Sequence, residues 1–233
     1  MGGPNVKNTM VDRLLGIVAP HLCSGCGKIG SLLCDNCKYN ITSQTFSGCI
    51  LCNRTSIEGI CQHHKVAFQQ IWVVGERSGT LQRLIGGFKF QNMKTAAHDL
   101  ADLLDKRLPR LPFDTQVVPV PTTPAHIRER GYDHLGLIAS GFAVRRGLTL
   151  NPLLGRKNMA TQHYANRQDR VNQAKSAFLL TGQVNPTLPY LIIDDVVTTG
   201  STILEASRLL ASAGAQYVSV GVLARQPLEI NKI

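Results

Sequence analysis

All seven cysteines of this chain lie between positions 23 and 61, and residues 62–233 contain none. Six of them stand in pairs separated by two residues, in the runs CSGC, CDNC and CILC, and the last begins the run CQHH. Cysteines paired in this way are typical of metal sites in a reducing compartment, where disulfides do not persist. The pattern predicts a metal-binding module, which we place at residues 21–66. An N-terminal segment with a short helix precedes it at 1–20, and a second domain follows at 67–233.

The spacing divides the candidate ligands into two sets of four. A CxxC knuckle points two thiolates at one ion, and two knuckles complete the tetrahedron that zinc prefers. The first set is Cys23, Cys26, Cys34 and Cys37, and the second set is Cys49, Cys52, Cys61 and His64. His63 is the alternative to His64, and pairing across the knuckles or buried free cysteines also stay open. Four ligands leave no open coordination position, so we expect two structural zinc ions that supply the folding energy of the module.

Composition and charge narrow the classes of partner. The chain is 43% hydrophobic and 17% charged, as globular proteins are, and its net charge of +10 favours polyanions or phosphorylated molecules. A basic surface without an anionic partner is the alternative. The apolar run 14–19 is too short to cross a bilayer and has no cleavage site behind it, so we expect no membrane insertion and a cytoplasmic location.

Beyond residue 70, apolar runs typical of strands alternate with segments that have helical spacing. The expected strands are residues 71–74, 117–120, 191–193 and 217–223, and the expected helices are residues 80–90, 95–107, 134–146 and 201–213. Alternation of this kind predicts an α/β fold with a mainly parallel sheet and helices on both faces. Ligands of such folds bind beyond the carboxyl ends of the strands.

The run LIIDDVVTTGST, residues 191–202, is the most informative stretch of this domain. An apolar strand ends in two adjacent acids, Asp194 and Asp195, and a small polar turn and then a helix follow. Free amides at a helix start form an anion site, and Gly200 would let the backbone approach a phosphate that a side chain would displace. The acids would then bind sugar hydroxyls. An ordinary capped turn with a solvated acid pair is the alternative.

This run resembles the 5-phosphoribosyl-1-pyrophosphate (PRPP) signature of type I phosphoribosyltransferases. Together with VVPVPTTPAHIRERGYDHLGLIA, the spacing from Gln162 to Arg170 to Phe178 and the cysteine pairs, it makes the chain similar to the ComF (ComFC/GntX-like) family, which is associated with natural transformation. The resemblance implies a type I phosphoribosyltransferase-like domain with an N-terminal double zinc ribbon. Two departures are His64, where many relatives carry cysteine, and Asn172, which stands one place early after Arg170.

The resemblance also implies roles for individual residues. The two acids would bind the ribose 2′- and 3′-hydroxyls as the catalytic pair, the turn would wrap the 5′-phosphate, and Mg²⁺ would chelate PRPP. The PRPP-binding residues implied are Asp194, Asp195, Thr198, Thr199, Gly200, Ser201 and Thr202.

Basic residues elsewhere would bind the pyrophosphate end of PRPP, by the same resemblance. Pro121 and Pro124 disfavour an immediate helix, so we expect a turn with free amides before the arginines that follow. The pyrophosphate-binding candidates are Arg128, Arg130 and Lys89. The polar segment 155–170 has no clear period and is interpreted either as a mobile loop that closes over the site or as an ordinary surface loop.

Three functions are compatible with these observations. The first is a PRPP-binding phosphoribosyltransferase that acts in the uptake or processing of single-stranded DNA during natural transformation. The second is a non-catalytic competence scaffold that binds single-stranded DNA and a helicase or recombination protein. The third is a nucleotide-salvage phosphoribosyltransferase. The residues name no acceptor nucleophile and leave open whether the protein is an enzyme.

Overall fold

The computed structural model describes residues 21–44, 46–56, 59–157 and 177–227. The short helix expected in 1–20 lies outside these residues, and so do Gln162, Arg170, Asn172 and the part of the expected loop beyond Lys157. Within the described part of the chain, no helix is both long and apolar enough to cross a membrane.

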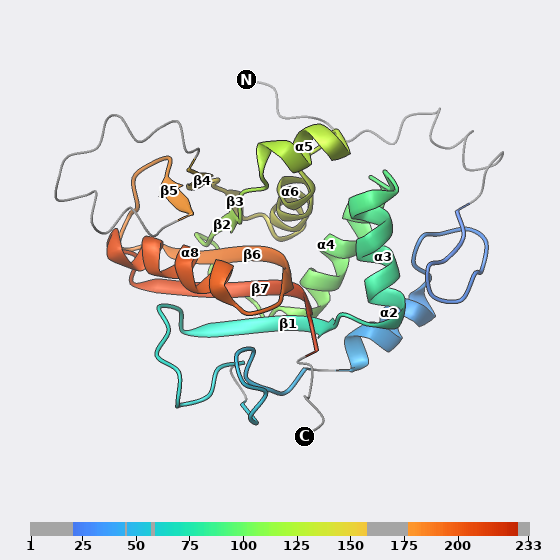
Figure 1. The fold of residues 1–233 in the computed structure, drawn as a ribbon, viewed down its shortest axis with the longest axis horizontal. Coiled ribbons are helices and arrows are strands. Elements are labelled where there is room, and N and C mark those ends of the chain that lie inside the picture. The colour runs from blue at the N-terminus through green and yellow to red at the C-terminus, as the bar shows by residue number, and fades with distance from the viewer. Residues whose placement is uncertain (1–20, 45, 57–58, 158–176, 228–233) are drawn as a thin grey trace.

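Five parallel strands form the central sheet, in the order β1-β7-β6-β2-β3 (Figure 1). Their bounds are Gln70–Glu76 for β1, Gln116–Pro119 for β2, Thr149–Leu150 for β3, Pro189–Val197 for β6 and Tyr217–Arg225 for β7. Central strands of such a sheet are covered on both faces and are therefore continuously apolar. Leu191, Ile192 and Ile193 of β6 are all fully buried. The predicted α/β fold with a parallel sheet is confirmed.

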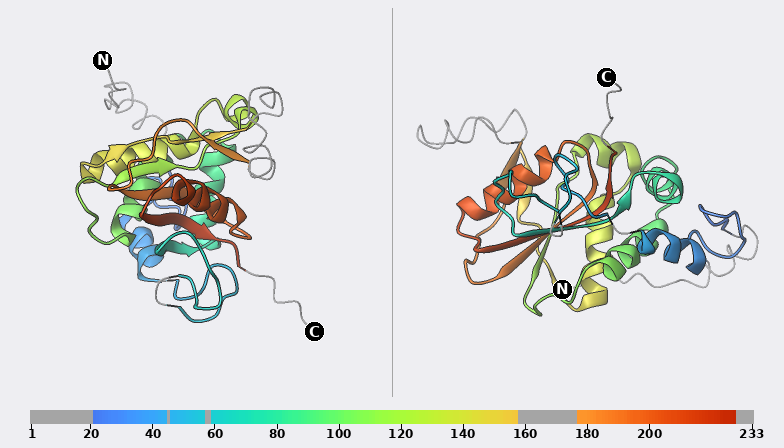
Figure 2. Two further views of the ribbon diagram at one scale, coloured as in Figure 1. Left: turned by 90° about the vertical axis from the view of Figure 1, so that its left-hand side faces the viewer. Right: turned by 90° about the horizontal axis from the view of Figure 1, so that it is seen from below.

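Helices cover both faces of the sheet (Figures 1 and 2). Helices α4 (Ala96–Arg107) and α6 (His134–Arg146) pack against each other on one face, and α8 (Ser201–Ser212) lies on the other. Helix α3 (Gly79–Phe90) connects β1 to α4, and a two-stranded antiparallel piece, β4 (Leu154–Arg156) with β5 (Phe178–Leu180), lies beside α8. The predicted helices agree with α3, α4, α6 and α8 to within one residue at each end.

The boundary between β2 and β6 is a topological switch point. β2 leads through α5 (Pro124–Arg130) and α6 to β3 on its outer side, whereas β6 leads through α8 to β7 on the opposite side. Open α/β sheets bind their ligands at such a point, beyond the carboxyl ends of the strands. β2 pairs with β6 only as far as Pro119 and Ile193, so β6 extends past the end of its neighbour.

The expected strand 191–193 was too short at its carboxyl end. β6 continues through Asp194 and Asp195 to Val197, which pairs with Arg225 of β7. The two acids therefore lie inside the strand, before its last two residues. Their backbone is fixed by β7 on one side, while the other side lies beyond the end of β2.

The expected turn before Arg128 is a short helix, α5 (Pro124–Arg130). A proline at the first helical position loses no needed hydrogen bond, and its fixed φ suits the helix. Thr123 caps the start by accepting a hydrogen bond from the amide of His126 at 3.2 Å, and Gly131, with φ of +76°, ends it. Pro124 therefore starts a helix where the sequence argument expected a turn.

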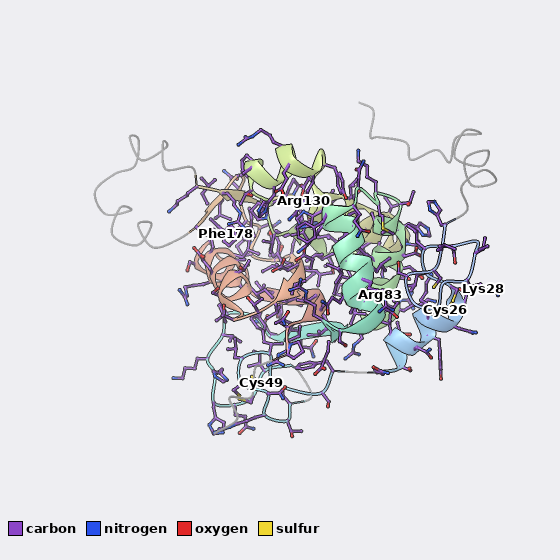
Figure 3. All side chains as sticks on the ribbon, turned by 45° about the vertical axis from the view of Figure 1, so that its right-hand side comes forward. Cys26, Lys28, Cys49, Arg83, Arg130 and Phe178 are labelled. Atoms are coloured by element: carbon purple, nitrogen blue, oxygen red, sulfur yellow. The ribbon has the colours of Figure 1, made fainter. Side chains whose placement is uncertain are left out.

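The two cysteine sets dock at separate places, which Figure 3 marks by Cys26 and Cys49. Near the first set, helix α2 (Asp35–Ser43) lies against α3 and α4, where Lys38 pairs with Asp99 and Asp102 at 3.4 and 2.7 Å. Arg83 of α3 donates to the carbonyl of Ser24 at 2.6 Å. The second set lies at the other side of the sheet, near the ends of β1 and β7. The boundaries 21–66 and 67–233 remain a prediction.

Candidate functional site

Two buried carboxylates lie side by side where β6 extends past β2. Asp194 and Asp195 are each 6% exposed. Asp194 Oδ1 accepts a hydrogen bond from the Asp195 amide at 2.9 Å, which fixes that carboxylate. Buried carboxylates require compensating charge or hydrogen bonds, so the groups around them define the site.

Asp195 is compensated by two donors on one oxygen. Lys89 Nζ, from the last turn of α3, lies 2.6 Å from Asp195 Oδ2, and His134 Nε2 lies 2.8 Å from the same oxygen. Lys89 and His134 come from elements far apart in the sequence, α3 and the start of α6. The fold therefore brings three chain segments together at Asp195.

Arg130 sets the proton position on His134. Arg130 NH1 lies 2.9 Å from His134 Nδ1, and a guanidinium can only donate. Nδ1 must therefore accept, which leaves the ring proton on Nε2, where it is donated to Asp195. The imidazole acts as a fixed donor to the acid.

The surroundings of the two acids shift their pKa values in opposite directions. Burial, followed by the negative charge of Asp195, raises the pKa of Asp194 to about 7. Burial would also raise the pKa of Asp195, but the hydrogen bond from His134 and the charge of Lys89 outweigh it and lower that pKa to about 2. Asp195 is thus the anion of the pair, and Asp194 is the acid whose ionisation a cation or a hydrogen-bond donor would promote.

The turn after β6 presents small polar groups at the start of α8. Thr198, Thr199 and Ser201 are exposed, and the Thr199 and Ser201 hydroxyl oxygens lie 3.0 Å apart. Gly200, with φ of +78°, is the N-cap and has no side chain to bond the first amides of the helix. Those amides and hydroxyls suit an anion. Thr202, the second residue of α8, is half-buried.

Gly200 faces the second cysteine set rather than the open side of the turn. A Cβ on Gly200 would lie 2.6 Å from Leu51 Cδ2 and 3.8 Å from Ile50 Cδ1. A side chain here would therefore strike the CILC knuckle, whereas the sequence argument expected it to fill the space of a phosphate. The positive φ still requires glycine for the turn itself.

The predicted basic residues are only partly brought together. Lys89 contacts Asp195 and Arg130 contacts His134 beside it, whereas Arg128 is exposed on α5; the role of all three in pyrophosphate binding stays a prediction. Two groups at the site were not assigned to it from the sequence. His134 bonds Asp195, and Arg156, which donates to the Pro121 carbonyl at 2.9 Å, contributes positive charge at Asp194. Only tertiary structure places these two residues at the acids.

Both cysteine sets have the geometry of a four-ligand site. The ligand atoms of each set lie within 4.8 Å of one another, and His64, not His63, completes the second set. Zn–S bonds of about 2.3 Å in a tetrahedron place sulfurs about 3.8 Å apart. The Cys26–Cys34 and Cys52–Cys61 sulfurs lie 3.7 and 3.6 Å apart. The residues therefore fit zinc, and each set could hold one ion.

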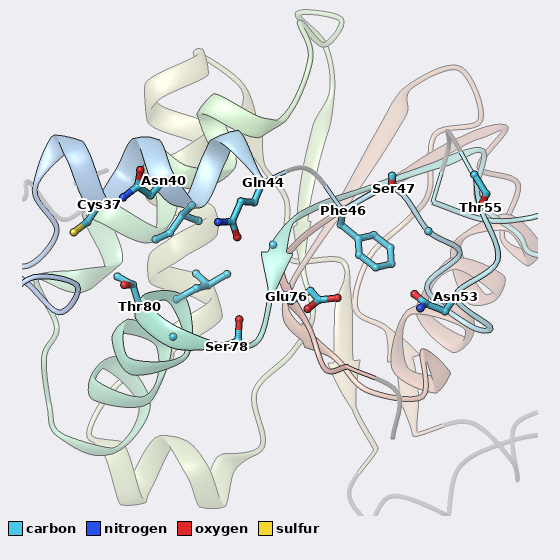
Figure 4. Close-up of a pocket in the computed structure, with 15 residues that line it drawn as sticks. Cys37, Asn40, Gln44, Phe46, Ser47, Asn53, Thr55, Glu76, Ser78 and Thr80 are labelled. Atoms are coloured by element: carbon cyan, nitrogen blue, oxygen red, sulfur yellow. The ribbon is translucent and has the colours of Figure 1, made fainter. Parts of the chain in front are cut away.

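A cavity of about 600 Å³ lies away from the acids, between α2, residues 46–55 and the start of α3 (Figure 4). Glu76, Asn53, Gln44 and Phe46 are among its lining residues. Among the described residues that line it there is one acid and no lysine or arginine, so the cavity lacks the charge that a phosphate needs.

Comparison with known proteins agrees with this geometry. Residues 188–232 match the family described as the phosphoribosyl transferase domain. Competence protein F of Haemophilus influenzae is 32% identical over 83% of this chain and 90% of its own length. DNA utilization protein YhgH of Salmonella typhi is 31% identical over 72% of this chain and 77% of its own. Competence protein ComFC of Streptococcus pneumoniae is 26% identical over 88% of this chain and 87% of its own.

The sheet, its switch point and the matched segment define a protein with a phosphoribosyltransferase-type fold. At the level of family, the chain belongs to the ComF family. Among solved structures, an adenine phosphoribosyltransferase from Thermoanaerobacter pseudethanolicus aligns with 64% of this chain and 76% of its own, at 16% identity and a TM-score of 0.38. That likeness is too low to carry a further conclusion.

Proposed function

We propose that this protein binds PRPP with Mg²⁺ at the carboxyl end of β6 and uses that site in the handling of incoming DNA in the cytoplasm. The observation that carries the proposal is the pair of acids at the switch point, followed directly by a hydroxyl-rich turn at the start of α8. Acids suit ribose hydroxyls, and free amides suit the 5′-phosphate. The matched phosphoribosyl transferase segment includes all of these residues.

Each group at the site then has a task. Asp194 and Asp195 would accept hydrogen bonds from the ribose hydroxyls, and the turn from Thr198 to Thr202 would hold the 5′-phosphate. Lys89 and Arg130 would offset the negative charge of the pyrophosphate end, with His134 keeping Asp195 oriented. Magnesium carried by PRPP would neutralise part of the same charge. Groups fixed in advance in this way cost little reorganisation when a ligand binds.

Phosphoribosyl transfer is the reaction that such a site would perform. The bond between ribose C1 and the pyrophosphate oxygen would break, the leaving pyrophosphate would carry away the electron pair, and an acceptor would form the new bond at C1. The chain contributes electrostatic stabilisation: cations compensate the charge that develops on the leaving group. The site geometry names no acceptor.

A second candidate function is the binding of single-stranded DNA. The names of the relatives, competence proteins and DNA utilization proteins, associate them with DNA. The net charge of +10 and the exposed Arg128 on α5 favour binding of a polyanion such as DNA. A helicase or recombination protein could be a second partner in the same process. The two functions are compatible, because the acids and the turn are distinct from the exposed basic surface.

Calorimetric titration of Asp195→Asn with Mg-PRPP tests the first candidate. The substitution keeps the size of the side chain but removes the charge that pairs with Lys89, so PRPP binding should weaken by about 1–3 kcal/mol. Asp114→Asn, before the amino end of β2 and therefore at the opposite edge of the sheet, is the matched control and should bind as the wild type does. Circular dichroism and zinc content should be unchanged in both. Equal PRPP affinity in the two variants would refute the assignment of Asp195.

A further inference from the structure

The second cysteine set lies directly against the candidate phosphate turn. Its CILC knuckle, residues 49–52, places Leu51 Cδ2 so close to Gly200 that a Cβ there would lie 2.6 Å from it. Ile50, the neighbouring knuckle residue, is fully buried in the core and would lie 3.8 Å from the same Cβ. Gly200 is the left-handed N-cap of α8, so the knuckle contacts the one residue whose backbone shapes the turn.

A buried arginine joins the same knuckle to the end of the sheet. Arg225, the last residue of β7, is 1% exposed and donates through Nε to the Ile50 carbonyl at 3.2 Å and through NH1 to Asn53 Oδ1 at 3.3 Å. Its backbone pairs with Val197, the residue that precedes the turn. The knuckle is therefore connected to the turn at two points. Leu51 contacts Gly200 directly, and Arg225, which bonds the knuckle, pairs with Val197 just before the turn.

The charges around Arg225 match a metal-loaded knuckle. A buried cation needs a counter-charge. Glu76, the strand neighbour of Arg225 in β1, is one such group, and the knuckle from Cys49 to Cys52 lies beside the guanidinium through the Ile50 carbonyl. Zinc with three thiolates and one neutral histidine carries a net charge of −1, which would complement the guanidinium.

We infer that the second zinc ribbon is a positioning element of the 5′-phosphate turn: metal in the set Cys49, Cys52, Cys61 and His64 holds Leu51 against Gly200 and so sets the affinity for a sugar 5-phosphate. The inference rests on the proposed function, and it assigns to this ribbon a task that the first ribbon does not share. Leu51 acts through Gly200 and contacts no ligand.

Ile50 and the two hydrogen bonds from Arg225 anchor the knuckle to the sheet, whereas its backbone hydrogen bonds stay within the ribbon, where metal binding acts. Three backbone hydrogen bonds hold it: Cys49 amide to Arg54 carbonyl at 2.7 Å, Asn53 amide to Cys49 carbonyl at 2.8 Å, and Ile50 amide to Gly59 carbonyl at 2.8 Å. All three bonds join residues of the same ribbon. Small modules of this kind order only when the ion is bound, so loss of zinc would release the knuckle and with it Leu51.

The first ribbon provides an internal control. Its contacts are with α3 and α4, through Arg83 to Ser24 and through Lys38 to Asp102. A Cβ on Gly25, inside its first knuckle, would meet Cys37 and Thr80 rather than the turn. Disturbing this ribbon should leave the phosphate turn in place.

The test compares two ligands in matched variants of the full chain. Ribose 5-phosphate carries the sugar phosphate, and pyrophosphate does not. In Leu51→Ala the dissociation constant for ribose 5-phosphate should rise at least about fivefold, the lower end of ordinary coupling between sites, while that for pyrophosphate stays unchanged. Leu51→Met should restore the contact and the affinity. Cys52→Ser should lose about one zinc ion, and its affinity for ribose 5-phosphate should fall as in Leu51→Ala. Cys26→Ser, at the matching position of the first ribbon, should also lose one zinc ion but should bind ribose 5-phosphate as the wild type does.

Linkage supplies a second readout, since coupling between two sites is reciprocal. Ribose 5-phosphate should reduce the fraction of zinc that a chelator removes at equilibrium from Cys26→Ser protein, which retains only the second site. If Leu51→Ala does not fold, Leu51→Val and the chelator experiment decide the question. Wild-type protein that binds neither PRPP nor ribose 5-phosphate would refute the proposed function and this inference together. Tight binding by the wild type, with equal affinity in Leu51→Ala and Cys52→Ser, would refute the inference alone.

Discussion

At the scale of single residues, the site is a pair of acids with unequal surroundings. Asp195 is held ionised by Lys89 and His134, while Asp194 has mainly the backbone amide of its neighbour. Arg130 fixes the tautomer of His134, so one arginine on α5 influences a carboxylate on β6 without touching it. The pair is therefore asymmetric before any ligand binds.

This asymmetry predicts how Asp194 affects stability as the pH changes. Burial raises its pKa from 3.8 to about 7 in the folded protein, whereas an unfolded chain ionises near the ordinary value. Its contribution to stability is complete below pH 3.8 and is lost as the pH rises toward 7. The melting temperature of Asp194→Asn, relative to the wild type, should therefore increase between about pH 4 and 7 and then level off. Thermal denaturation over this range measures it, and a difference that does not vary with pH would contradict the burial of an ionisable Asp194.

At the scale of elements, the sequence predicted most of the large domain because its helices and strands have clear hydrophobic periods. α6 agrees with the expected range at both ends, and α8 differs by one residue. The misses have identifiable reasons. Pro124 was treated as a breaker although it suits the first helical position, and the expected buried range covered only residues 191–193 because carboxylates rarely lie inside a buried strand.

The site itself was only partly predictable. The acids and the turn are contiguous in the sequence, so one motif identifies them. Lys89 was assigned to pyrophosphate, but the end of α3 brings it to Asp195, and His134 reaches the same oxygen from α6. Contacts of this kind depend on how helices pack on the sheet, which no local pattern encodes. The approach of Leu51 to Gly200 is likewise a tertiary contact.

The first ribbon is the element whose removal should be tolerated best. Cys34→Ser removes one of its four ligands, so this ribbon should lose its ion and unfold, and the zinc content should fall from about two ions per chain to about one. The sheet has its own buried core, so the main melting transition should persist. Elemental analysis and circular dichroism measure these results. Freshly purified wild-type protein without zinc, or the loss of all ordered structure in Cys34→Ser, would contradict this account.

At the scale of the whole molecule, the net charge of +10 predicts a salt-dependent interaction with nucleic acid. Each neutralised phosphate releases counterions, so affinity for single-stranded DNA should fall steeply with salt. Arg128→Ala and Arg130→Ala should each reduce the salt slope without changing sequence preference. Fluorescence anisotropy with labelled oligonucleotides at several salt concentrations tests this. If no binding occurs even at low salt, a role in DNA handling would have to depend on protein partners.

The central claim is that the end of β6 is a PRPP site, joined by Gly200 to the second ribbon. Calorimetric titration of the wild-type protein with Mg-PRPP tests it most directly. The account predicts saturable binding at one site per chain, with ribose 5-phosphate competing for it. If the protein binds neither PRPP nor ribose 5-phosphate in the presence of magnesium, the claim is contradicted, and the fold would serve a competence scaffold without a sugar-phosphate ligand.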